Sequence, residues 1–121
     1  MKISIGLLIA SLTITSAYSA TNGDEIKVPF RLAKGKNLFD ENCSSCHGLQ
    51  LNGSDKGPPL IHGLYRPSHH GDPAFYRAAL QGVRAHHWPL GDMPPVPGMT
   101  REKMDNILPY IRYYQQQKKL Y

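Results

Sequence analysis

The sequence predicts a single all-α domain whose helices are joined by long loops. Apolar residues recur at helical spacing in three segments, residues 31–42, 72–81 and 101–117, and no segment alternates polar and apolar residues as a strand would. The chain of 121 residues contains 11 glycines and 10 prolines, which favours long structured connections. This length fits one domain with one core.

The first predicted helix, residues 31–42, places Leu32, Leu38 and Phe39 on an apolar side. Gly35 stands in its middle, where glycine costs about 1 kcal/mol relative to alanine. We therefore expect another helix to approach Gly35 closely. The loop that follows, residues 48–71, is interrupted too often by glycine, proline, serine and histidine to hold long elements.

The two later helices carry clear start signals. Asp72 is the expected N-cap of the second helix, with Pro73 at its first turn and Gly82 just past its end. A proline-rich loop, residues 89–98, separates it from the last helix, which Thr100 is expected to cap. The apolar positions of that last helix are Met104, Ile107, Leu108, Ile111 and Tyr114.

The N-terminus has the three-part layout of a secretory signal peptide. Lys2 precedes an apolar run of about 12 residues, shorter than the roughly 20 needed to span a bilayer, and small residues follow it. Cleavage after Ser19 leaves small residues at both recognition positions, Ala17 and Ser19. We expect residues 1–19 to be the signal peptide and residues 20–121 the domain, which is periplasmic and has no transmembrane segment.

The formal charge is modest: 14 Lys+Arg against 9 Asp+Glu give +5. These charges are scattered along the chain, whereas a nucleic-acid-binding surface would cluster them. We therefore expect no nucleic-acid partner.

The chemistry is concentrated in Cys43-Ser44-Ser45-Cys46-His47, directly after the first helix. C-x-x-C-H is a motif for covalent haem attachment, in which two thiols one helical turn apart form thioethers and the adjacent imidazole is the proximal ligand of the iron. A disulfide between the two cysteines would close a very small loop and stabilise little. A thioredoxin-like pair would need a βαβ setting, and a zinc site would need a fourth ligand from elsewhere.

Four segments together resemble the class I c-type cytochromes, which carry one haem. They are residues 35–48, 57–60, 92–95 and 107–112, and they occur in the order found in that family. The resemblance spans nearly the whole mature chain. It implies an all-α cytochrome c fold, with three to four main helices and long loops wrapped around one covalently bound haem c.

The resemblance also implies roles for individual residues. Gly35 is expected to meet Tyr110 where the first and last helices cross. The carbonyl of Pro58, or of Pro59 as second choice, is expected to accept a hydrogen bond from the proximal His47, fixing its tautomer. Leu60 is expected to pack on the haem face.

The sixth iron ligand implied by the resemblance is Met93, in a loop stiffened by Pro94 and Pro95. Met104 fits the apolar stripe of the last helix better, and Met99 fits the entrance of that helix. His/Met ligation raises the reduction potential of a haem.

Two histidine pairs keep another ligand set open. His69-His70 precedes the second helix and His86-His87 precedes the Met93 loop. Any of them could replace the methionine. They could instead lie in solvent, line the haem propionates, or capture copper or zinc.

The function expected from the resemblance is extracytoplasmic electron transfer without bond chemistry, so the protein is not expected to be an enzyme in its own right. It would act as a soluble carrier or as the haem subunit of a periplasmic oxidoreductase, with redox proteins as partners. The alternative is a haem-based sensor of small ligands, or a haem enzyme, with an open or displaceable sixth site.

Overall fold

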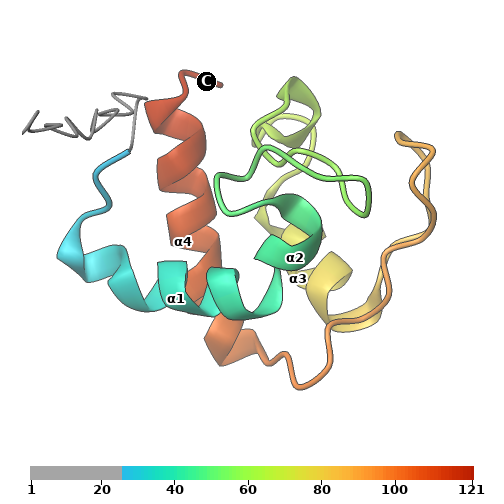
Figure 1. The fold of residues 1–121 in the computed structure, drawn as a ribbon, viewed down its shortest axis with the longest axis horizontal. Coiled ribbons are helices and arrows are strands. Elements are labelled where there is room, and N and C mark those ends of the chain that lie inside the picture. Colours follow the sequence, from blue (N-terminus) through green and yellow to red (C-terminus); the bar gives the residue numbers. More distant parts are fainter. Residues whose placement is uncertain (1–25) are drawn as a thin grey trace, which may run out of the picture.

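Helices and loops build the whole of the described chain, residues 26–121 of a computed structural model (Figure 1). The predicted signal peptide and residues 20–25 lie outside this range. The elements, in order, are η1 (Phe30–Leu32), α1 (Ala33–Asn42), α2 (Ser44–His47), η2 (Gly63–Tyr65), α3 (Asp72–Gln81) and α4 (Arg101–Gln117), where η denotes a 3₁₀ helix. No strand occurs between residues 26 and 121, so the all-α prediction is confirmed.

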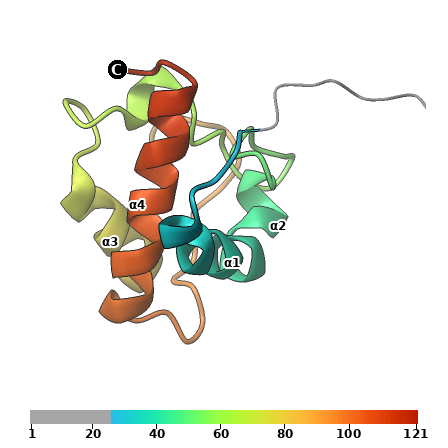
Figure 2. The same ribbon diagram turned by 90° about the vertical axis from the view of Figure 1, so that its left-hand side faces the viewer.

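α1 crosses α4, and this crossing is the most extensive contact between elements (Figures 1 and 2). At the crossing Gly35 is so close to α4 that an added Cβ atom would lie 2.1 Å from the carbonyl oxygen of Asn106 and 3.2 Å from the Cβ atom of Tyr110. The rings of Phe39 and Tyr110 pack beside it, with centroids 5.6 Å apart. The expected meeting of Gly35 with Tyr110 is therefore confirmed, and the glycine is required because the two backbones touch.

α3 also packs on α4. The first turn of α3 differs from the prediction. The N-cap is Gly71, and Asp72 is the first helical residue instead of the cap. The carboxylate of Asp72 accepts a hydrogen bond from Arg112 Nε at 2.9 Å. Because this charged partner on α4 holds the carboxylate, Asp72 does not turn back to cap its own helix.

The core lies where α4 meets α1 and α3. Its fully buried side chains include Phe39, Ile107 and Tyr110, and Met104 is 2% exposed, as its place on the apolar stripe predicts. Gln115 is the polar exception at 0% exposure, and its amide donates to the Leu60 carbonyl at 2.7 Å.

Within residues 26–121, none of the helices is both long enough and apolar enough for a membrane span.

Candidate functional site

The two cysteines lie one helical turn apart at the junction of α1 and α2. Cys43 ends α1, with its N–H donating to Phe39 O at 2.8 Å, and its own carbonyl accepts from His47 N at 2.9 Å. This local geometry puts Cys43 and Cys46 on neighbouring positions of one turn. No disulfide joins them, and burial, followed by the neighbouring Cys46, raises the pKa of the Cys43 thiol to about 11.

The imidazole of His47 is buried and oriented. Its Nδ1 lies 2.9 Å from the carbonyl oxygen of Pro58, which can only accept, so Nδ1 carries the proton and Nε2 is the nitrogen that can bind a metal. Burial lowers the pKa of His47, against the opposing effect of the Pro58 hydrogen bond. Burial therefore favours the neutral ring and the Pro58 hydrogen bond fixes its tautomer, which together give the form that ligates iron.

The loop after α2 folds back to present that carbonyl. Gly53 N donates to His47 O at 2.7 Å, and the hydroxyl of Ser54 donates to Cys46 O at 2.6 Å. Gly57 lies against α2, where an added Cβ atom would be 2.9 Å from Cys46 O. Pro58 follows directly, which is why it, and not Pro59, reaches His47.

An apolar cavity of about 410 Å³ lies beside these residues. Cys43, His47, Leu60 and Met93 border it, and Leu60 is 6% exposed. Most of the remaining wall is apolar and comes from α3, α4 and the loop between them: Ala74, Phe75, Ala78, Ala79, Val83, Val96, Met104, Ile107 and Ile111. Tyr65, His70, Arg77 and His86 also border the cavity. Such a wall suits a flat apolar macrocycle, with two thiols and one imidazole at its side, so the residues present fit a covalently bound haem.

Backbone hydrogen bonds fix the position of Met93 in the loop between α3 and α4. Met93 N donates to Val83 O and Val83 N donates to Met93 O, both at 2.8 Å. Gly82, at φ +81°, lies so close that an added Cβ atom would be 2.6 Å from Met93 O. Val96 N completes the attachment by donating to Ala79 O on α3 at 2.9 Å.

The four paired histidines come together from two loops. His69 and His70 lie before α3, His86 and His87 lie after it, and the ring centroids of His70 and His87 are 5.2 Å apart. His70 and His86 also border the haem cavity. Partial loss of hydration, followed by the charges of His86, His70 and His69, lowers the pKa of His87.

Sequence reasoning missed the residues that hold this side of the cavity. Arg112 Nη1 donates to Tyr65 O at 2.7 Å and to Gln115 Oε1 at 2.8 Å, and Arg112 Nη2 donates to His70 O at 2.8 Å. In the sequence, only the spacing of Arg112 and Gln115, three positions apart beside the apolar stripe of α4, could have indicated this contact.

Fold and site together define a small all-α domain built to hold a covalently attached haem. The chain belongs to the cytochrome c family, whose Cytochrome c model matches residues 32–115, and its cofactor is therefore haem c. Cys43, Cys46 and His47 fit the attachment motif of that cofactor.

Two curated relatives are similar over part of their length. The chain is 27% identical over 113 residues to the Cbb3-type cytochrome c oxidase subunit CcoP of Azospirillum sp. (strain B510), covering 79% of this chain and 36% of the relative. It is 35% identical over 57 residues to a cytochrome bc1 complex cytochrome c subunit of Corynebacterium efficiens, covering 46% of this chain and 18% of the relative. The chain thus spans about a third or less of these proteins. No solved structure matches it significantly.

Proposed function

We propose that the protein transfers electrons outside the cytoplasm through one haem c, attached at Cys43 and Cys46, with His47 and Met93 as axial ligands. When bound, the haem supplies a one-electron iron couple whose potential depends on those ligands. The residues of this chain orient the ligands and keep water away from the iron. The observation that carries the proposal is that His47 and Met93 border the same apolar cavity, each fixed by backbone hydrogen bonds.

Met93 is favoured over the other two methionines of the described chain by its surroundings. His47 and Met93 both border a second cavity, of about 110 Å³, as well as the cavity of about 410 Å³. Met104 borders only the larger of the two. Met104 is also buried in the hydrophobic core, where it packs from α4. Met99 packs at the edge of the core and borders neither cavity.

His86 is the competing ligand. It also borders both cavities, and its Nδ1 lies 2.9 Å from the carbonyl of Arg84, which leaves Nε2 as the nitrogen that can bind a metal. Its side chain is exposed, however, so binding would have to order it on the iron at an entropic cost. Met93 is less exposed and its backbone is already held by its pairing with Val83, so we favour Met93.

The test is the absorption spectrum of the haem-loaded protein, oxidised and reduced, with and without carbon monoxide. We expect Met93→Ala to abolish the weak red sulfur-to-iron band, to lower the reduction potential and to bind one carbon monoxide per haem, because the sixth position opens. The matched control is Met99→Ala, which should leave the spectrum unchanged and carbon monoxide excluded.

Three results would contradict the proposal, the first two by overturning the ligand assignment. If Met93→Ala stays low-spin and closed to carbon monoxide, Met93 is not the ligand. If His86→Ala alone opens the site, the iron has two histidine ligands. If the unaltered protein itself binds carbon monoxide readily, the haem-based sensor or enzyme replaces the electron carrier as the best account.

We further propose that the domain works as a soluble carrier or as the haem subunit of an extracytoplasmic oxidoreductase, without bond chemistry of its own. The predicted signal peptide, residues 1–19, and the names of the two relatives support this. Purification of the haem protein from its native membranes and soluble fraction separates the two forms. A stable complex of fixed stoichiometry would identify a subunit, and a monomer in the soluble fraction would identify a carrier.

A further inference from the structure

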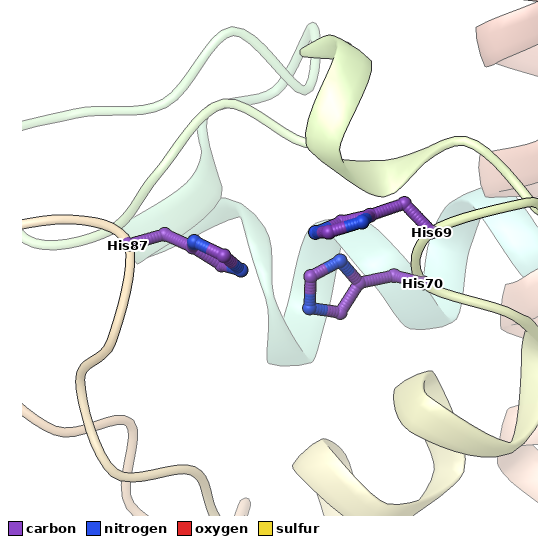
Figure 3. Close-up of side chains that lie close together, drawn as sticks. All are labelled: His69, His70 and His87. Carbon is purple, nitrogen blue, oxygen red and sulfur yellow. The ribbon is translucent and has the colours of Figure 1, made fainter.

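A cluster of imidazoles at the edge of the haem cavity is not used by the proposed electron transfer. Figure 3 shows three of its members, with the rings of His69 and His70 directed toward His87 from the opposite loop. One ring nitrogen from each of the three lies within 4.8 Å of the other two. The ring of His86 lies beside them, with its centroid 4.2 Å from that of His87.

His70 is held in the manner of a metal-binding histidine. Its Nδ1 lies 2.6 Å from the carbonyl oxygen of Leu64, so Nδ1 carries the proton and Nε2 keeps its lone pair. Metal-bound histidines commonly donate their other ring N–H to a backbone carbonyl in this way. The His70 carbonyl in turn accepts from Arg112 on α4, which anchors this side of the cluster.

The opposite side of the cluster is anchored as well. The loop that carries His87 is closed by Asp92 Oδ1, which accepts from Ala85 N at 2.8 Å, and by the pairing of Val83 with Met93. It is joined to α3 by Val96 N, which donates to Ala79 O at 2.9 Å. The side chains of His69 and His87 are exposed, so their rings can rotate without unpacking the core.

The donor set selects the kind of metal. Three neutral imidazoles without a carboxylate suit Zn²⁺ and Cu²⁺, and not Mg²⁺ or Ca²⁺, which require oxygen. Zinc–nitrogen bonds of about 2.0–2.1 Å place tetrahedral ligand atoms about 3.3 Å apart. To reach that separation the two exposed rings would have to rotate, and water or His86 would take the fourth position.

We propose that His69, His70 and His87 bind one Zn²⁺ or Cu²⁺ ion, which joins the loop before α3 to the loop that carries Met93. The three histidines are not among the proposed axial ligands, His47 and Met93, although His70 also borders the haem cavity. A bound ion would add a metal cross-link between two loops that already meet through ring contacts, such as that of His62 with Trp88.

The test uses the mature, haem-loaded protein, purified without a polyhistidine tag and treated with a chelator that is then removed. Zn²⁺ is titrated by calorimetry, and Cu²⁺ is followed by electron paramagnetic resonance at one equivalent. We expect one ion per protein, coupling of the copper signal to several nitrogen nuclei, and an unchanged haem absorption spectrum.

Variants identify the ligands. His69→Ala and His87→Ala should each weaken binding at least about tenfold, the size of effect seen even when a partner behind a metal ligand is removed. Both side chains are exposed, and the haem spectrum and circular dichroism report whether each variant folds. The matched control is His62→Gln, because His62 lies in the same loop region but outside the three-histidine set. Glutamine can still accept from Leu64 N, and only the ring contact of His62 with Trp88 is lost.

Three results would overturn the proposal. The first is the absence of stoichiometric binding of either metal. The second is unchanged affinity in both His69→Ala and His87→Ala. The third is loss of the axial-ligand band when metal is added, which would place the metal on the iron ligands instead.

Discussion

Replacing Gly35 by alanine tests the crossing of α1 and α4, on which the cavity wall depends. The new Cβ atom would lie 2.1 Å from Asn106 O and 2.9 Å from Asn106 C, and both of these are backbone atoms that cannot rotate away. Ordinary contacts of carbon are about 3.5–4.0 Å, so the helices would have to separate by more than about 1 Å. The neighbouring contact of Phe39 with Tyr110 would then loosen.

The magnitude follows from two opposing effects. Overpacking of a core contact costs about 1–3 kcal/mol, and a collision with backbone belongs at the upper end. Alanine recovers about 1 kcal/mol of helix propensity relative to glycine. The net loss in free energy of unfolding is therefore about 2 kcal/mol, which lowers the Tm of a domain of this size by about 8–16 °C.

The assay is thermal unfolding of the haem-loaded protein, followed by far-ultraviolet circular dichroism. Gly63→Ala is the matched control, because nothing lies within 4 Å of a Cβ atom added there. Its Tm should stay close to that of the unaltered protein. If Gly35→Ala shifts Tm no more than Gly63→Ala does, the close approach of the two helices does not limit stability and the reasoning is wrong.

Two further predictions concern stability. Arg112→Lys keeps the charge but loses the planar fork that holds the carbonyls of Tyr65 and His70, so denaturant unfolding should show a loss of about 2–4 kcal/mol. The exposed Arg66→Lys is its control, and equal stability of the two variants would contradict the prediction. Burial raises the pKa of Tyr110 above its ordinary value. Above about pH 10 the unfolded chain therefore loses a proton that the folded protein retains, and stability falls by up to about 1.4 kcal/mol per pH unit. Tyr110→Phe should make this fall shallower by that amount in denaturant titrations between pH 9.5 and 11.5, and an unchanged slope would refute the assignment to Tyr110.

The sequence alone determined the features that depend on residues close together in the chain. The spacing of Cys43, Cys46 and His47 defines the haem motif because one helical turn brings three successive functional groups to one place. The helical periods gave three helices, and the observed bounds of α4, Arg101–Gln117, agree with the prediction. Gly35 indicated a close helix crossing because glycine is otherwise unfavourable inside a helix.

The tertiary structure decided every feature that depends on which distant groups meet. The sequence left Pro58 and Pro59 as alternative partners of His47, and the packing of Gly57 on α2 brings the carbonyl of Pro58 to the ring. Asp72 has the sequence of an N-cap, yet Arg112, 40 residues later, takes its carboxylate.

The histidines are another case in which the sequence alone could not predict which distant groups meet. Their two pairs are plain in the sequence, but His70 and His87 lie on opposite sides of α3 in the chain, and no local pattern tells whether their loops converge. Local propensity acts over a few residues, whereas a site built from loops depends on how the core brings those loops together. The haem motif could therefore be read from the sequence, and the imidazole cluster beside it could be found only in the folded protein.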